Sequence, residues 1–142
     1  MHILVTEASE GESKNVVESL AAAGHRVSTC HEAGSICRAM VPGGKCPLDL
    51  IYDPIEVTVG VRSGGRPELS TREYGLVCSV RADVPFVVTS AHERPSPAAP
   101  SGFADAVYAA VPESHLVDAC GRAVWATDEG RWAPFRRPRV SS

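Results

Sequence analysis

The sequence predicts an α/β fold with a doubly wound, five-stranded parallel sheet. Four short apolar runs have the length and composition of buried strands, at residues 3–5, 48–52, 84–89 and 106–111. Residues 25–30 are a fifth predicted strand, with Val27 as its surest buried member. Segments with helical spacing of apolar residues separate most of these runs, and strands joined through a helix cannot pair as a hairpin. Right-handed crossovers between parallel strands are therefore expected. The 142 residues are sufficient for one such domain.

The first predicted helix follows a turn after the strand at residues 3–5. Ser9 and Glu12 have the spacing of a capping box, which would satisfy the free amide groups at the start of the helix. Gly24 suits the end of this helix, because glycine readily adopts the left-handed conformation found there. The face expected to contact the core carries Val16, Val17, Leu20 and Ala23.

The run at residues 48–52 is predicted to be the middle strand, covered on both faces by helices, and it leads directly to Asp53 and Pro54. Ligands of open α/β sheets gather beyond the carboxyl ends of the strands, so Asp53 is a candidate functional residue. Asp followed by Pro is also a common turn. Residues 35–41 predict a short helix, and the alternating valines of residues 56–62 predict an extended arm or an edge strand.

A second capping-box pattern, Ser70 with Glu73, predicts the start of another helix. The side chains expected to share one face of this helix are Tyr74, Val77, Cys78 and Arg81. The strand at 84–89 follows and ends at Thr89. This arrangement places a hydroxyl at the carboxyl end of the fourth strand.

Proline shapes the remainder of the domain. Pro95, Pro97 and Pro100 are incompatible with a regular fourth helix, which is expected to be shortened or missing. Pro112 suits the first turn of a last helix. The side of this helix expected to be buried carries Leu116, Val117, Cys120, Ala123 and Val124.

Composition argues against several classes of protein. The five cysteines are odd in number and contain no C-x-x-C, so neither a disulfide framework nor a zinc ribbon is expected. His25, Cys30, His31 and Cys37 lack a recognisable spacing of metal ligands. No secretory leader or apolar segment of membrane-spanning length is found, so a cytoplasmic location without membrane contact is expected.

Residues 1–125 are expected to form the folded domain, and residues 126–142 an Arg- and Pro-rich tail. Nucleic acid is expected to bind, if at all, only through phosphate contacts of this tail. The arginines concerned are Arg131, Arg136, Arg137 and Arg139. A solvated terminus is the commoner explanation of such a tail.

The layout of residues 2–125 resembles the receiver domain of bacterial two-component response regulators, a flavodoxin-like fold. The matching features are the first strand leading to Glu7, the run at 48–52 ending at Asp53, the strand at 84–89 ending at Thr89, and Pro112 after the fifth strand. The segment Gly102-Phe103-Ala104-Asp105 before that strand also matches. The resemblance implies a signalling module whose partner is a sensor kinase, an output protein or a second copy of the chain.

The resemblance also implies roles for individual residues. Asp53 would be the phosphoacceptor, Thr89 the switch hydroxyl, and Glu7, Glu10 and Asp53 the candidate ligands of Mg²⁺, with no other cofactor expected. Such chemistry needs cations, because a phosphoryl dianion approaches a carboxylate only when charge is neutralised.

Three departures from the receiver pattern weaken the predicted phosphorylation site. Ala8 replaces the second acid of the first strand, Val111 replaces the lysine before Pro112, and Pro54 directly follows the acceptor. The prediction is therefore an atypical or pseudo-receiver without enzymatic activity, with poor or absent phosphorylation, acting through protein contacts.

Two alternatives remain open. The first 30 residues resemble the opening of short-chain dehydrogenases and related epimerases, which would imply a degenerate Rossmann-type nucleotide site. In this chain Glu7, Glu10 and Ser13 occupy the three glycine positions of the phosphate-binding turn, and the two carboxylates would repel a pyrophosphate. The other alternative is a flavodoxin-like module that binds a small molecule in an apolar pocket.

Overall fold

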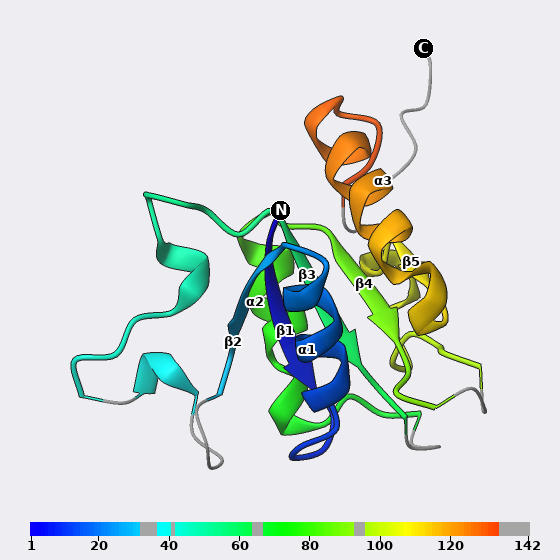
Figure 1. Ribbon diagram of the computed structural model, residues 1–142, viewed down its shortest axis with the longest axis horizontal. Helices are drawn as coiled ribbons and strands as arrows, with labels where there is room; N and C mark the ends of the chain where they lie inside the picture. Colours follow the sequence, from blue (N-terminus) through cyan, green and yellow to red (C-terminus); the bar gives the residue numbers. More distant parts are fainter. Residues whose placement is uncertain (32–36, 41, 64–66, 93–95, 134–142) are drawn as a thin grey trace.

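A computed structural model describes residues 1–31, 37–40, 42–63, 67–92 and 96–133. Five parallel strands form one sheet in the order β2-β1-β3-β4-β5, which confirms the predicted fold class (Figure 1). Their bounds are β1 His2–Glu7, β2 Arg26–Thr29, β3 Val57–Val61, β4 Phe86–Thr89 and β5 Ala109–Ala110. All four pairings between neighbouring strands are parallel, as a doubly wound sheet requires.

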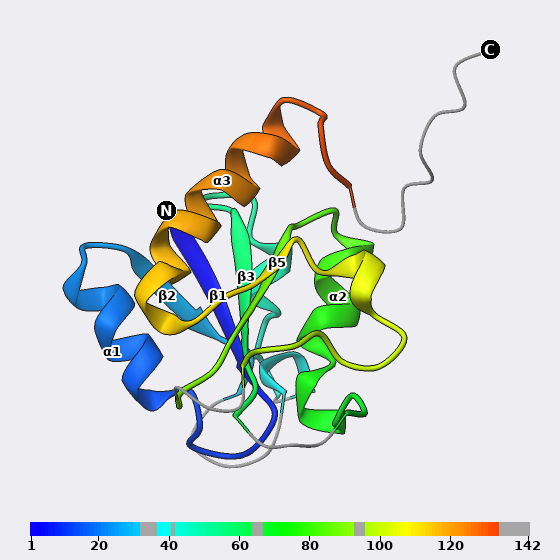
Figure 2. The same cartoon turned by 90° about the vertical axis from the view of Figure 1, so that its right-hand side faces the viewer.

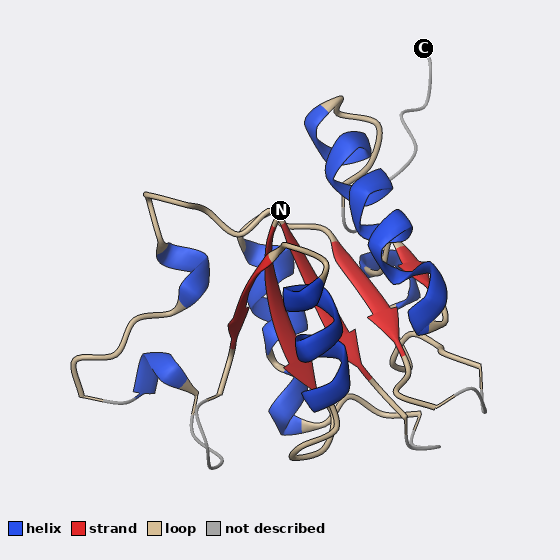
Figure 3. Cartoon of the chain, viewed as in Figure 1, coloured by secondary structure: helices blue, strands red, loops and turns tan. Residues whose placement is uncertain are grey.

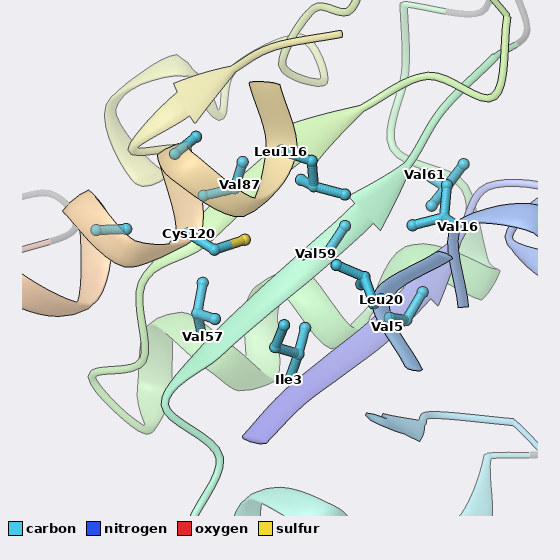
Figure 4. Packing of buried hydrophobic residues seen from close by; sticks show 12 residues of the cluster. Ile3, Val5, Val16, Leu20, Val57, Val59, Val61, Val87, Leu116 and Cys120 are labelled. Atoms are coloured by element: carbon cyan, nitrogen blue, oxygen red, sulfur yellow. The ribbon is translucent and has the colours of Figure 1, made fainter. Parts of the chain in front are cut away.

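Helices cover both faces of the sheet. α1 (Lys14–Ala22) and α3 (Leu116–Asp128) lie on one face, and α2 (Gly75–Arg81) lies on the other (Figure 2). The larger core cluster lies between the sheet and the pair α1 and α3 (Figure 4). It includes Ile3, Val5, Val16, Leu20, Val57, Val59, Val61, Val87, Leu116 and Cys120. On the α2 face, a smaller cluster consists of Leu76, Phe86, Val88 and Ala106.

The prediction that residues 48–52 form the middle strand is wrong. Residues 47–49 form the 3-10 helix η2 (Pro47–Asp49), and Ile51 and Tyr52 are 87% and 89% exposed. The middle strand is β3, whose five residues are all buried. Its valines face the larger core, while on the other face Thr58 contacts Ser79 of α2 and Gly60 lies against the ring of Phe86. The predicted extended conformation is therefore present, but in the centre of the sheet.

Two connections lack an α-helix within the described residues. Between β2 and β3 the described residues form the 3-10 helices η1 (Arg38–Met40) and η2, which extend away from the sheet (Figure 3). Residues 32–36 and 41, in the segment predicted as a short helix, lie outside the described residues. Between β4 and β5 the described residues contain only η4 (Ala104–Ala106), which agrees with a shortened or missing fourth helix.

One of the two predicted capping boxes is present. Before the 3-10 helix η3 (Thr71–Glu73), the hydroxyl of Ser70 and the carboxylate of Glu73 cap each other's backbone. Ser9 does not cap α1, because the residue before that helix is Ser13. The difference arises because Glu7, and not Ser9, binds the free amides of this turn.

The predicted faces of the later helices are partly wrong. α2 buries Gly75, Leu76 and Ser79, whereas Tyr74 and Val77 are exposed. Without an α-helix between β2 and β3 in the described residues, that side of α2 has no helical neighbour there. α3 buries Leu116, Cys120 and Ala123 as predicted, but Val117 is 42% exposed.

The end of α3 extends past residue 125, the predicted boundary of the domain. The helix continues to Asp128, and the ring of Trp132 packs edge-on against Tyr108 at a centroid distance of 5.5 Å. Arg131 lies over the ring of Trp125 at 4.8 Å. Arg136, Arg137 and Arg139 lie outside the described residues. No helix in the described part of the chain combines the length and apolar character that a membrane span requires.

Candidate functional site

One row of residues crosses three strands at the carboxyl edge of the sheet. The register pairs Glu7 of β1 with Val61 of β3, and Val61 with Thr89 of β4. Neighbouring strands lie about 4.8 Å apart, so two of the predicted site residues share this edge on either side of a valine. The middle position of the row, where the receiver resemblance requires a carboxylate, is apolar.

Asp53 lies at the opposite edge of the sheet, so the prediction that it shares a crevice with Glu7 and Thr89 is wrong. It precedes β3, and the Nδ1 atom of His2 donates a hydrogen bond of 2.8 Å to its backbone oxygen. Its carboxylate forms an ion pair with Arg26. His2 and Arg26 are the first residues of β1 and β2. These contacts fix Asp53 at the amino ends of the strands, with a left-handed φ of 62° that Asp tolerates.

Glu7 is held at the start of α1 by four donor groups. Its Oε2 accepts hydrogen bonds from the amide and hydroxyl of Ser13 at 2.8 and 2.6 Å. Its Oε1 accepts from the amide of Gly11 at 3.0 Å and from the guanidinium of Arg72 at 3.0 Å. In nucleotide-binding relatives of this fold, the helix N-terminus binds a phosphate. Here the carboxylate of the chain itself occupies the position of that anion.

Hydrogen bonding and burial at this edge shift the pKa values of two carboxyl groups in opposite directions. Burial raises the pKa of Glu7, but the hydrogen bonds from Ser13, Arg72 and Gly11 outweigh it, so the pKa lies below the ordinary value of 4.5. Burial raises the pKa of Glu12, and the backbone hydrogen bonds that it accepts do not compensate. Within the described residues, Oε1 of Glu12 is buried without a hydrogen-bond partner. The same edge therefore holds one stabilised and one destabilised carboxylate.

A buried ion pair lies directly after β3. Arg62 and Glu73 are 8% and 2% exposed, and Nε of Arg62 donates to Oε2 of Glu73 at 2.5 Å. The guanidinium also donates to the backbone oxygens of Glu68 and Ala98 at 2.9 and 3.2 Å. The first residue beyond the middle strand is thus a neutralised cation and not a reactive acid.

The remaining predicted residues do not complete a phosphorylation site. Thr89 is fully buried, and its hydroxyl has no hydrogen-bond partner in the described part of the chain. Glu10 is exposed on the turn before α1. Glu7, Glu10 and Asp53, the predicted Mg²⁺ ligands, are not brought together, because Asp53 lies at the other edge. In the described ranges, no three His, Cys, Asp or Glu side chains are arranged to hold a metal ion.

Sequence reasoning missed the two arginines that organise this edge. Arg62 and Arg72 each hold one of the carboxylates, Glu73 and Glu7 respectively. Arg62 could have been identified if residues 57–61 had been chosen as the middle strand, because it would then be the first residue beyond the strand end. No local pattern around Arg72 indicates its contact with Glu7, which lies 65 residues away in the chain.

Comparisons with known proteins support the α/β fold of the chain and do not assign it to a family. No protein-family model matches the chain, and no curated protein matches it. A fusion protein carrying the trimeric coiled coil of yeast Spc42 is similar in structure, with a TM-score of 0.55 at 17% identity. The match covers 92% of this chain and 83% of that chain.

Two further solved structures are similar over most of this chain. A sensor protein from Polaromonas sp. JS666 has a TM-score of 0.53 at 16% identity, covering 89% of this chain and 97% of that chain. The response regulator StyR has a TM-score of 0.50 at 18% identity, covering 92% of this chain and 62% of that chain. At these identities the similarity shows a shared α/β fold, which is consistent with a receiver-like arrangement.

Proposed function

We propose that the chain is an atypical receiver-like signalling module that works through protein contacts and without phosphorylation of an aspartate. The strand order and the structural similarity to a sensor protein and to a response regulator support the receiver-like part of this proposal. The geometry of the carboxyl edge supports the absence of phosphorylation. Neither observation calls for an enzymatic activity.

A single observation carries the proposal: Val61 and Arg62 occupy the end of the middle strand. Phosphoryl transfer to a receiver needs a carboxylate at that position, together with acids that hold Mg²⁺. Here Arg62 is paired with the buried Glu73, and Glu7 is paired with Arg72 and caps α1. Glu7 and Glu73 are therefore already neutralised by the protein's own cations and amides.

Incubation with acetyl phosphate and Mg²⁺, followed by intact-mass spectrometry, tests this part of the proposal. We expect no stable gain of phosphate in the wild-type chain, while an active receiver treated in parallel gains one. Asp53→Ala is expected to give the same result as the wild type. A stable gain of one phosphate that disappears in Asp53→Ala would refute the proposal.

The protein-contact part of the proposal is supported by the distribution of exposed apolar side chains. Most of the large exposed apolar side chains in the described residues lie between β2 and the end of α2. They are Met40, Leu50, Ile51, Tyr52, Tyr74 and Val77. Exposed apolar side chains that gather in one region of a protein surface are typical of an interaction site. We place the partner contact on these side chains, which come from the β2–β3 connection, where the described residues contain no α-helix, and from the start of α2.

Site-specific photo-crosslinking in cells that express the protein naturally tests this surface. A benzoylphenylalanine at Tyr52, which is 89% exposed, should cross-link to a defined protein or to a second copy of the chain. The same probe at Arg122, an exposed polar position on α3, serves as the matched control. Equal cross-linking at both positions, or none at Tyr52, would contradict the proposed surface.

The dinucleotide-binding alternative finds no support in this site. The start of α1, which would bind the pyrophosphate, is occupied by the carboxylate of Glu7. A negatively charged ligand would have to displace this carboxylate and would meet Glu10 and Glu12 in the same turn.

A further inference from the structure

A cavity of about 540 Å³ lies between the segment that follows β2 and the start of α2. Its volume is within the range of small-molecule sites. The walls come from the end of β2, from η1 and η2, and from the residues around the start of α2. They consist of Cys30, His31, Cys37, Met40, Cys46, Pro47, Leu48, Thr71, Arg72, Tyr74, Gly75 and Cys78. The cavity exists because no α-helix fills this space between β2 and β3 in the described residues.

Sulfur dominates these walls. Five of the twelve lining residues carry a sulfur atom, namely Cys30, Cys37, Met40, Cys46 and Cys78. All five cysteines of the chain are free thiols. Burial raises the pKa of Cys30 to about 12, and burial also raises the pKa values of Cys46 and Cys78. At neutral pH these thiols are protonated and act as small, polarisable apolar groups.

The charges around the cavity argue against an ionic ligand. Among the described residues that line the cavity there is no carboxylate. Arg72 is the permanently charged residue of that described lining, and its guanidinium already binds Glu7 at 3.0 Å. An anion would compete with this carboxylate. Tyr74 and the sulfur atoms offer favourable contacts to an aromatic ring.

We propose that this cavity binds an uncharged, largely apolar small molecule, with an aromatic compound as the best fit. The inference goes beyond the proposed function and does not depend on it. Arg72 and His31 line this cavity and also the hollow beside Glu7 at the start of α1. A ligand in the cavity would therefore contact residues that also line the carboxyl edge of the sheet. Binding could alter that edge without any phosphate.

Fluorescence titration with N-phenyl-1-naphthylamine, an uncharged apolar dye, tests the proposal on the full chain. We expect saturable binding of one dye per chain with a blue shift in emission. The anionic dye anilinonaphthalene sulfonate, which has the same ring system, should bind more weakly by about tenfold or more. Equal binding of the two dyes, or no saturable binding of the uncharged one, would overturn the proposal.

Two substitutions in neighbouring positions of α2 locate the dye. Cys78→Phe places a larger side chain in the wall of the cavity and should weaken binding by about tenfold or more. Val77→Phe adds a ring at the next position, which does not line the cavity, and should leave the affinity unchanged. Equal loss in both variants would show binding to the exposed surface and would overturn the proposal.

A measurement on the wild-type chain keeps the proposal testable if Cys78→Phe does not fold. Saturating dye should slow the alkylation of Cys46 and Cys78 by iodoacetamide, as followed by peptide mass spectrometry. Unchanged alkylation of both thiols would overturn the proposal, as would tight binding of Cd²⁺ alone with a thiolate absorption band and no dye binding. A phosphorylated aspartate would refute the proposed function and leave this result unaffected.

Discussion

At the scale of single residues, the turn after β1 is organised by one carboxylate. Glu7 accepts hydrogen bonds from Gly11, Ser13 and Arg72, and in this way satisfies amides at the start of α1 that a capping side chain or a bound anion would otherwise take. The contact with Arg72 also ties this turn to the segment before α2. Glu7 is thus a structural residue of the carboxyl edge.

The lowered pKa of Glu7 predicts acid sensitivity with a definite sign. In the folded chain the pKa of Glu7 lies below its ordinary value of 4.5, so the ionised carboxylate stabilises the fold. This stabilisation is complete above about pH 4.5. It is lost as the pH falls through the lowered pKa. Glu7→Gln should be less stable than the wild type at pH 7 and should lose less stability between pH 5 and 3. Urea unfolding across this range measures the effect, and parallel pH profiles would contradict it.

The raised pKa of Glu12 predicts the opposite behaviour. Because burial favours the protonated form in the folded chain, Glu12 costs stability once the pH rises above 4.5. Glu12→Gln should therefore raise the free energy of unfolding at pH 7 and leave it little changed at pH 4. A Glu12→Gln variant that is less stable than the wild type at pH 7 would contradict this prediction. It would show that both carboxylate oxygens of Glu12 have hydrogen-bond partners in solution.

The buried pair of Arg62 and Glu73 predicts a large cost when one partner is neutralised. Glu73→Gln keeps a residue that can complete the capping box with Ser70, but it leaves Arg62 charged and buried. We expect a loss of about 3 kcal/mol in the free energy of unfolding.

Asp118→Asn is the matched control for this prediction. Asp118 pairs with Arg122 at 3.0 Å, and both side chains are well exposed. The control should cost less than about 0.5 kcal/mol. Urea unfolding of both variants makes the comparison, and similar losses would mean that the Arg62–Glu73 pair is accessible to water.

At the scale of elements, β3 combines large residues on one face with small ones on the other. Val57, Val59 and Val61 fill the larger core, while the hydroxyl of Thr58 accepts a hydrogen bond of 2.8 Å from Ser79 of α2. Gly60 lies against the ring of Phe86. The small residues leave space on this face for α2 beside Thr58 and for the ring of Phe86 beside Gly60.

Gly60→Ala tests this close packing. A Cβ at Gly60 would meet Cζ and Cε1 of Phe86 at 2.5 and 2.6 Å, and the buried ring has little space to move. We expect a loss of about 2 kcal/mol in stability. Phe86→Leu in the same chain should recover part of this loss, which a double-mutant cycle measures. Strictly additive effects would contradict the contact.

The elements also show how far sequence reasoning reaches. β1, β2, β4 and α3 are recognisable because continuous apolar runs or helical spacing mark them. β3 was missed because Thr58 and Gly60 interrupt its valines, and the pattern resembles that of a half-exposed strand. Leu48 to Tyr52 is more apolar, yet Pro47 begins a 3-10 helix there and leaves Ile51 and Tyr52 in solvent. Hydrophobicity alone could not decide whether residues 48–52 or residues 57–61 form the middle strand. The true strand is less apolar because the face toward α2 requires small residues at Thr58 and Gly60.

At the scale of the whole molecule, the position of the middle strand in the sequence decides the chemistry of the site. The fold class follows from the number and spacing of the apolar segments, and the strand order agrees with the resemblance to receiver domains. Pro95, Pro97 and Pro100 predict a shortened or missing fourth helix, and the described residues between β4 and β5 contain no α-helix. The composition of the site depends on which residue ends the middle strand. With β3 at residues 57–61, Asp53 moves to the amino edge and Arg62 takes the carboxyl edge. The sulfur-lined cavity could not be predicted, because its walls come from segments distant in the chain.

The measurement that tests this account most directly is an NMR titration of the ¹⁵N-labelled chain with fluoroberyllate and Mg²⁺, which add to a receptive carboxylate as a mimic of acyl phosphate. We predict that the amide signals of Glu7, Arg62 and Thr89 at the carboxyl edge, and that of Asp53, stay unchanged at saturating reagent. Saturable, Mg²⁺-dependent shifts of the Arg62 and Thr89 signals would contradict the account, because they would show an acid at this edge that accepts a phosphoryl group.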